Sequence, residues 1–297
     1  MRAFFLLGLV ACSTQDDTPN PALEFQFAMA VIADSHLGGS DAPAERLTMA
    51  VDWINTHRQA RQIEIVPVLG DIAWGDGLWP ARTRLDALEV PYIPVMGDNE
   101  VAFGDEMTFA EVFAPQLDVL AAEFEDWRVG GGLTYNPVHD QQSHFQTYAF
   151  RHHDLEFLVL DWASRSTHKV LSEMADRHDF TGGVWPWFTE YLRELETGLD
   201  HRVVMLTHNP MYMGVGGFNV DDFNAVAEET IGQRDAIWAN LAGHLHYGDT
   251  IDLGPEAGYD VHLIDALWDD VMTIQVIDVY RDANGFVFEQ ENITVPG

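Results

Sequence analysis

Short groups of aspartate and histidine follow several hydrophobic runs of this 297-residue chain. The groups are Asp34-Ser35-His36, Gly70-Asp71, Gly97-Asp98-Asn99-Glu100, His208 and Gly243-His244-Leu245-His246. Carboxylate and imidazole are the ligands that hold Zn, Fe or Mn in proteins. The ends of strands are where an α/β sheet presents its functional groups. The pattern therefore predicts a hydrolytic site with two metal ions.

Each group has an ordinary explanation when it is taken alone. An extended segment would point Asp34 and His36 to one side, and likewise His244 and His246, yet such pairs also occur by chance. Gly70 allows a sharp bend before Asp71, but a Gly-Asp pair is also a common turn. The five groups in this order, each after a hydrophobic run, favour a shared site.

The elements that must position these residues follow from the hydrophobic pattern. We expect strands and helices to alternate through the first part of the chain, followed by a strand-rich end. The predicted strands are Phe25–Ala33, Ile63–Leu69, Val90–Met96, Phe145–Phe150, Leu155–Asp161, Val203–Thr207, Ile237–Ala242, Tyr259–Ala266, Thr273–Tyr280 and Phe286–Glu291. The predicted helices are Ala44–Gln59, Leu78–Leu88, Thr108–Trp127, Trp185–Leu195 and Asp222–Gln233. The segment Gly130–Pro137 is predicted to be a loop. This order indicates two sheets with helices outside them.

The composition limits the function classes. The chain has 15 Lys and Arg against 48 Asp and Glu, a formal net charge of −33. Such a surface repels polyanions, so we expect no bulk binding of nucleic acid, although a small nucleotide is not excluded. Hydrophobic residues make up 47% of the chain, enough for a full core. The sequence does not indicate the oligomeric state.

The first 21 residues are predicted to lie outside the fold. Met1-Arg2 is followed by an apolar stretch too short to span a bilayer, and Cys12 is the chain's only cysteine. Leu9-Val10-Ala11-Cys12 resembles a bacterial lipobox, in which the cysteine receives the lipid. We therefore expect a lipoprotein signal and tether over 1–21, and a protein anchored through Cys12 to a membrane of the bacterial cell envelope. The alternative is an ordinary cleaved signal with a chance cysteine.

The clusters as a set resemble those of the calcineurin-like metallophosphoesterases. The resemblance runs from about Phe25 to His246 and implies one domain over 22–297, a four-layer α/β/β/α sandwich of two mixed sheets flanked by helices. It implies that Asp34, His36 and His246 hold one metal, that Asp98, His208 and His244 hold the other, and that Asp71 bridges both. The metals would be two transition metal ions such as Fe, Mn or Zn. A water between them would attack the phosphorus of a small phosphate mono- or diester.

Two positions depart from the family pattern. Most members have Gly-Asn-His-Asp/Glu where this chain has Gly97-Asp98-Asn99-Glu100. Asp98 is still an oxygen ligand, but Asn99 replaces a catalytic histidine and cannot transfer a proton at neutral pH. Purple acid phosphatases have a tyrosine ligand where this chain has Trp74, so the chain resembles the non-purple members.

Two functions remain open at this stage. The first is a metallophosphoesterase that uses Asp71 and Asn99 in catalysis. The second is a metal- or phosphate-binding surface protein of the same fold whose turnover is impaired by Asn99. Other histidines could supply the missing proton, with His139 and His144 as the first candidates; the rest are His152, His153, His168 and His178. The glycine-rich segment 211–219 is either a flap over the metals or a plain loop.

Overall fold

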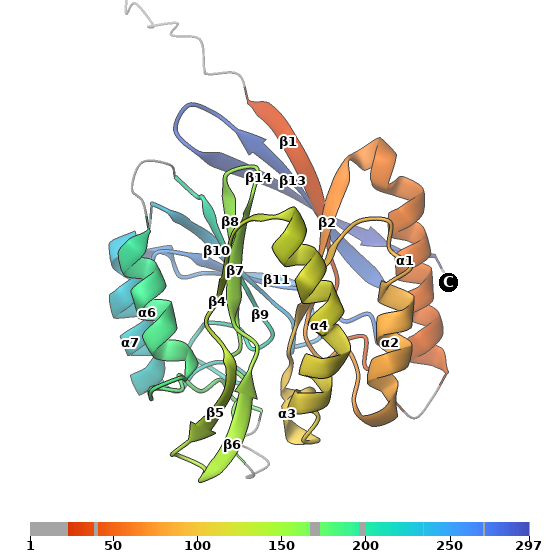
Figure 1. Ribbon diagram of the computed structural model, residues 1–297. Helices are drawn as coiled ribbons and strands as arrows, with labels where there is room; N and C mark the ends of the chain where they lie inside the picture. Colours follow the sequence, from red (N-terminus) through yellow and green to blue (C-terminus); the bar gives the residue numbers. More distant parts are fainter. Residues whose placement is uncertain are drawn as a thin grey trace, which may run out of the picture.

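Two β-sheets face each other across a hydrophobic layer, and helices cover the outer face of each sheet (Figure 1). The computed structural model describes residues 23–38, 41–166, 173–195, 200–233, 235–269 and 271–296. This arrangement is the predicted four-layer α/β/β/α sandwich of two mixed sheets. The predicted lipid attachment at Cys12 lies outside the described residues.

The first sheet has the strand order β14-β13-β1-β2-β3. The neighbours β1, β2 and β3 are parallel, whereas β13 pairs antiparallel with both β1 and β14. Its strands are β1 (Glu24–Val31), β2 (Ile63–Leu69), β3 (Tyr92–Val95), β13 (Thr273–Arg281) and β14 (Phe286–Thr294). The carboxyl ends of β1, β2 and β3 therefore meet at one edge, where the first three sequence groups lie.

The second sheet has the order β11-β12-β10-β9-β8-β7-β4. Strands β8, β9, β10 and β12 are parallel, and the remaining strands pair antiparallel. Its strands are β4 (Glu125–Val129), β7 (Tyr148–His152), β8 (Leu155–Leu160), β9 (Val203–Thr207), β10 (Ile237–Ala242), β11 (Asp249–Asp252) and β12 (Asp260–Leu263). His208 follows β9, and His244 and His246 follow β10, so this sheet supplies the other sequence groups.

Helices α1, α2 and α4 cover the first sheet, and α6 and α7 cover the second (Figure 1). The helices are α1 (Ala42–Arg61), α2 (Leu78–Leu85), α3 (Asp98–Ala102), α4 (Glu106–Glu123), α6 (Val184–Glu194), α7 (Val220–Thr230) and α8 (Gly254–Ala257). Pro43 lies in the first turn of α1, where its missing N–H costs no hydrogen bond. The Asn219 side chain caps α7 by accepting hydrogen bonds from two backbone N–H groups.

Alternation along the central strands builds three hydrophobic layers. In β1, Ala28 and Ala30 pack toward the helices, while Phe27 and Met29 pack between the two sheets. Since successive side chains of a strand point to opposite faces, a strand covered on both sides must be apolar throughout. This explains why the covered part of β1, from Phe27 to Val31, is a continuous hydrophobic run.

Two sequence predictions about elements are wrong. Residues 130–137, predicted as a loop, contain strand β5 (Gly132–Asn136), which pairs with β6 (Gln141–Phe145) in a separate two-stranded sheet. The helix predicted over 108–127 ends at Glu123, and β4 begins at Glu125. Both strands are largely exposed, so neither contains the continuous hydrophobic run that marks the covered strands of the two large sheets.

Among the described residues, no helix is both long and apolar enough to cross a membrane.

Candidate metal centre

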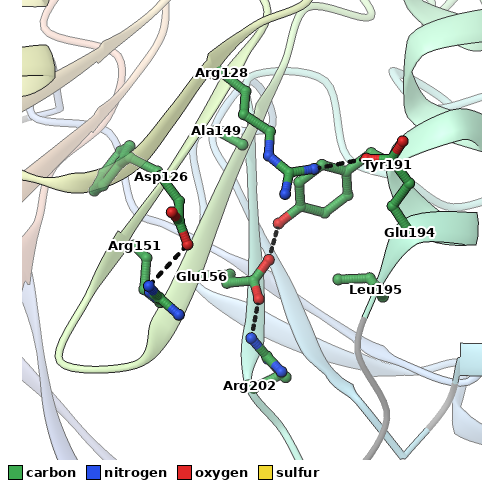
Figure 2. Close-up of a pocket in the computed structure, with 10 residues that line it drawn as sticks. Asp126, Arg128, Ala149, Arg151, Glu156, Tyr191, Glu194, Leu195 and Arg202 are labelled. Carbon is green, nitrogen blue, oxygen red and sulfur yellow. Dashed lines mark hydrogen bonds and ion pairs between the residues drawn. The ribbon is translucent and has the colours of Figure 1, made fainter.

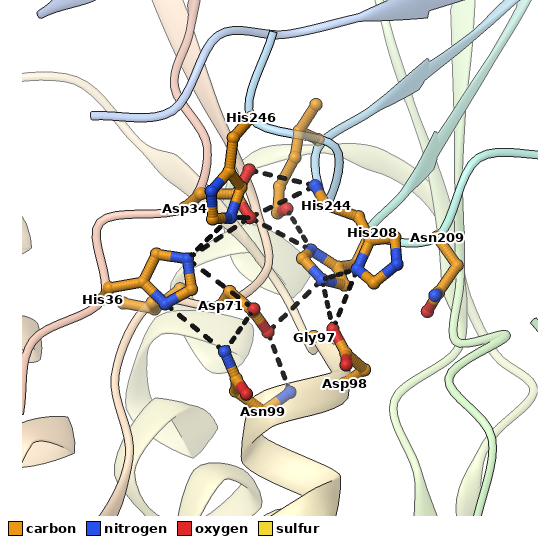
Figure 3. A network of polar contacts seen from close by, with 12 residues as sticks. Asp34, His36, Asp71, Gly97, Asp98, Asn99, His208, Asn209, His244 and His246 are labelled. Atoms are coloured by element: carbon orange, nitrogen blue, oxygen red, sulfur yellow. Dashed lines mark hydrogen bonds and ion pairs between the residues drawn. The ribbon is translucent and has the colours of Figure 1, made fainter. Parts of the chain in front are cut away.

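Seven predicted ligands converge at the carboxyl ends of strands from both sheets (Figure 3). Asp34 and His36 follow β1, Asp71 follows β2, Asp98 opens α3 after β3, His208 follows β9, and His244 and His246 follow β10. The side chains of six of the seven are at most 11% exposed, and that of His246, at 30%, is the most accessible. Residues up to 212 positions apart in the sequence thus form one polar cluster between two hydrophobic sheets.

Asp34, His36 and His246 form the first group, with one potential ligand atom from each lying within 4.8 Å of the others. The Nε2 atoms of His36 and His246 are 3.0 Å apart. Asp34 Oδ1 lies 3.7 Å from His36 Nε2 and 3.4 Å from His246 Nε2. Three donor atoms that face a common point in this way suit a single cation.

Asp98, His208 and His244 form the second group under the same criterion. Asp98 Oδ1 lies 2.8 Å from His208 Nε2 and 3.0 Å from His244 Nδ1. The two imidazole nitrogens are 3.2 Å from each other. This second set of one carboxylate and two imidazoles has the same composition as the first.

Asp71 lies between the two groups. Its Oδ1 is 3.3 Å from His208 Nε2, and its Oδ2 is 3.8 Å from His36 Nε2. One carboxylate therefore reaches a histidine of each group with a different oxygen. That is the placement expected of the bridging residue.

The backbone at the site differs from the sequence expectation. Asp34, His36, Asp71, His244 and His246 all have positive φ, between 47° and 72°. We expected extended segments that point alternate residues to one side, and this expectation is wrong. The left-handed conformation costs about 1–3 kcal/mol for a residue with a side chain, and such strain gathers at functional sites.

Two glycines permit the close approach of these loops. Gly70 has φ of +77°, and a Cβ at this position would lie 2.5 Å from the His208 side chain. A Cβ at Gly97 would collide with the backbone nitrogen and carboxylate of Asp71. Glycine is therefore required at both position 70 and position 97.

The cluster has an excess of negative charge in a buried setting. In the part of the chain that the structure describes, every ion pair made by Asp34, Asp71 or Asp98 is to a histidine. Burial raises the pKa of Asp71 well above its usual value. Burial lowers the pKa of His208, but the Asp71 and Asp98 carboxylates outweigh it and raise that pKa well above normal. Bound cations would therefore stabilise the buried carboxylates of this cluster.

The histidine nitrogens of the cluster can present lone pairs to metal ions. His208 Nδ1 lies 2.9 Å from the carbonyl oxygen of Leu69, which can only accept, so Nδ1 donates there. In the neutral ring, Nε2 then presents its lone pair to Asp98 and Asp71, as a metal ligand must. Burial also lowers the pKa of His36 to about 4, which keeps that ring neutral at physiological pH. These residues fit a pair of transition metal ions.

Asn99 contacts the central carboxylate twice. Its backbone N–H donates to Asp71 Oδ1 at 2.9 Å, and its side-chain Nδ2 donates to Asp71 Oδ2 at 2.6 Å. Nδ2 also lies 3.3 Å from His36 Nδ1. The Asn99 amide is thus positioned to orient Asp71, a contact that sequence reasoning did not anticipate.

Glu100 is a second residue whose role sequence reasoning missed. It is fully buried and accepts hydrogen bonds from the backbone N–H groups of Ala73 and Gly97. Burial raises its pKa to about 7. Glu100 therefore ties the loop after β2 to the loop after β3, and its presence in the Gly97–Glu100 motif was the available signal.

Two tryptophans lie beside the first group. The rings of Trp74 and Trp268 are each 5.6 Å from the His36 ring, and Trp268 is also 5.6 Å from His246. Trp268 is 47% exposed, so part of this aromatic surface is open to solvent. No motif marks Trp268, because it comes from a loop far along the chain that only the fold brings here.

The described histidines considered as substitute acids belong to other elements of the fold. His139 and His144 belong to the β5–β6 hairpin region, and His178 bonds the backbone of Ala163. None of the described candidates is hydrogen-bonded to the seven clustered residues, and His168 lies outside the described ranges.

Asn209, next to His208, donates to the carbonyl of Gly216 at 3.1 Å, which ties the glycine-rich segment to the site.

A separate polar pocket lies between strands β4, β7 and β8 and helix α6 (Figure 2). Its arginines are matched by carboxylates: Arg128 pairs with Glu194, Arg151 with Asp126, and Arg202 with Glu156. Tyr191 also bonds Glu156. These groups satisfy one another, so the pocket links sheet to helix and does not resemble the convergent donor set of Figure 3.

Comparison with known proteins supports the fold. No family model matches the chain, and a search of curated proteins found no match. Three solved structures are similar: a dimetal phosphatase from Danio rerio (TM-score 0.59, 15% identity), a proposed 5′-nucleotidase from Staphylococcus aureus (0.53, 12%) and a purple acid phosphatase from yellow lupin, Lupinus luteus (0.50, 11%). The similarity covers 92% of this chain and 100% of the first structure, 91% and 54% for the second, and 93% and 54% for the third. The chain thus shares the metallophosphatase fold and spans about half the length of the latter two proteins.

Proposed function

We propose that this protein is a metal-dependent hydrolase of small phosphate esters. The proposal rests on one observation above all: two groups of one aspartate and two histidines, joined by Asp71, at the carboxyl ends of strands from both sheets. The fold similarity to a dimetal phosphatase agrees with it.

Two bound cations would lower the pKa of a water molecule and stabilise the charge that develops on the phosphoryl oxygens. The clustered side chains would fix the positions of these two ions. Asp34, His36 and His246 would hold one ion, Asp98, His208 and His244 the other, and Asp71 both. Leu69 fixes the tautomer of His208, and Asn99 fixes the orientation of Asp71.

Asn99 occupies the position where the resemblance implies the acid that protonates the leaving group. The Asn99 side chain points its N–H toward Asp71, and an amide gives up no proton at neutral pH. Esters with good leaving groups do not need that proton. We therefore propose that activated aryl esters are turned over more readily than alkyl phosphates.

The decisive experiment is an assay of metal-depleted protein with nitrophenyl phosphate and its bis-ester, before and after addition of Mn²⁺, Zn²⁺ or Fe²⁺. We expect metal-dependent hydrolysis, and the preferred substrate will separate a monoesterase from a diesterase. The Asp71→Asn variant should lose this activity, while Asp52→Asn, a change at an exposed position of α1, should keep it.

The same assay distinguishes the hydrolase from the second candidate, a binding protein with impaired turnover. Metal binding without hydrolysis of either activated ester would favour that candidate. Absence of metal binding would reject the hydrolase and a metal-binding protein alike, because each requires the clustered ligands to hold metal.

We also propose that the protein is anchored in the bacterial cell envelope through a lipid on Cys12. The support is the Leu9-Val10-Ala11-Cys12 sequence. Cells that receive a labelled fatty acid should label the wild-type protein and not Cys12→Ser. A mature protein that begins at another residue and is extracted without detergent would contradict the anchor.

A further inference from the structure

Glu64, His152 and His153 form a third group of potential metal ligands, away from the centre described above. His152 Nε2 and His153 Nε2 each lie 2.9 Å from the same oxygen, Glu64 Oε2. One potential ligand atom from each residue lies within 4.8 Å of the others. We refer to these three residues as the Glu64 cluster.

The cluster lies at the opposite end of the sheets from Asp71. Glu64 is near the start of β2, and Asp71 follows its end. The five residue steps from Glu64 to the end of β2 at Leu69 span about 17 Å, and the cluster and the first centre have no ligand in common. His152 ends β7 of the second sheet, so the cluster joins residues of the two sheets.

The hairpin between β7 and β8 holds the two imidazoles in place. His153 and Asp154 form its two-residue turn with φ of +49° and +64°, a conformation usually given to Asn-Gly. The His153 ring stacks on Phe27 at 5.3 Å, and the His152 ring contacts Phe27 edge-on at 4.8 Å. The turn and Phe27 thus direct adjacent histidines toward one carboxylate.

The neighbouring arginines have carboxylate partners outside the cluster. Arg151 pairs with Glu125 and Asp126, and Arg281 pairs with Asp154. Glu64 is thus the carboxylate that faces the two imidazoles.

We propose that Glu64, His152 and His153 bind a third metal ion, Zn²⁺, with solvent in the remaining position. Two imidazoles and one carboxylate are an established three-residue donor set for zinc. Zinc–ligand bonds of about 2.0–2.1 Å in a tetrahedron place ligand atoms about 3.3 Å apart, close to the observed 2.9 Å. Such an ion would clip the first sheet to the β7–β8 hairpin of the second.

The test measures zinc content of the full chain after equilibrium dialysis against micromolar Zn²⁺. Relative to wild type, Glu64→Gln and the double change His152→Gln/His153→Gln should each lose about one zinc per chain. His57→Gln is the matched control, since the His57 ring bonds the Trp53 carbonyl of its own helix, and it should lose none. Asp71→Asn tests the first centre and should leave this zinc in place, so failure at one centre is distinguishable from failure at the other.

Nitrogen NMR of the histidine side chains supplies a measurement that does not depend on the variants folding. Addition of Zn²⁺ to wild-type protein should shift the Nε2 resonances of His152 and His153. Unchanged resonances together with unchanged zinc content in the variants would overturn the proposal and leave the cluster as a pair of hydrogen bonds to Glu64.

Discussion

Replacement of Asn99 by alanine tests how the central carboxylate is held. Asp71 is 2% exposed and accepts two hydrogen bonds from Asn99, one from the backbone and one from the side chain. Asn99→Ala keeps the first and removes the second. Burial already raises the pKa of Asp71, and loss of a donor raises it further, so an incoming metal must displace a more tightly held proton.

The magnitude follows from the hydrogen bond that is lost. A hydrogen bond to a charged group contributes about 1.5–3 kcal/mol, and 1.36 kcal/mol corresponds to a factor of ten. We therefore expect Asn99→Ala to bind metal about 10- to 150-fold more weakly at pH 7. This agrees with the usual 10- to 100-fold effect of removing a residue that orients a metal ligand.

The assay is competition for Zn²⁺ or Mn²⁺ with a chromophoric chelator, after thermal unfolding has shown that the variant folds. Asn55→Ala is the matched control, because the Asn55 amide also makes two hydrogen bonds but joins α1 to the segment before β3. Its affinity should equal that of wild type. If Asn99→Ala binds metal within twofold of wild type, the side-chain contact with Asp71 does not orient the ligand and our reasoning is wrong.

Three further predictions concern the same centre and the stability of the fold. Asp71→Asn should lose most of both metals by elemental analysis, since one carboxylate serves both groups; retention of two ions would contradict a bridging role. Asn99→His should raise activity toward alkyl phosphates more than toward nitrophenyl phosphates, because only a poor leaving group needs the added proton donor; equal gains would point to another acid. Burial lowers the pKa of His262 from 6.5 to about 4, so the unfolded chain takes up a proton between these values that the folded chain does not. The free energy of unfolding should therefore fall by about 3 kcal/mol from this group as pH drops from 6.5 to 4, and denaturant titrations should show a shallower decline in His262→Gln.

The sequence determined the layers of this fold and the membership of its main cluster. The part of β1 from Phe27 to Val31 is apolar at every position because both faces are covered there, and this property is readable from a hydrophobic run alone. The polar residues that end these runs then have to meet, since parallel strands bring their carboxyl ends to the same edge. Asp34, Asp71, Asp98 and His208 were predictable as neighbours for that reason.

The tertiary structure decided the features that depend on contacts between distant segments. The left-handed backbone at Asp34 and His244, the donation from Asn99 to Asp71 and the proximity of Trp268 to His36 have no local signal. The Glu64 cluster joins residues 88 and 89 positions apart on two sheets. A sequence specifies each strand through its own hydrophobic pattern, but the side chains that meet between strands are set by how the sheets pack, because that packing alone fixes their distance.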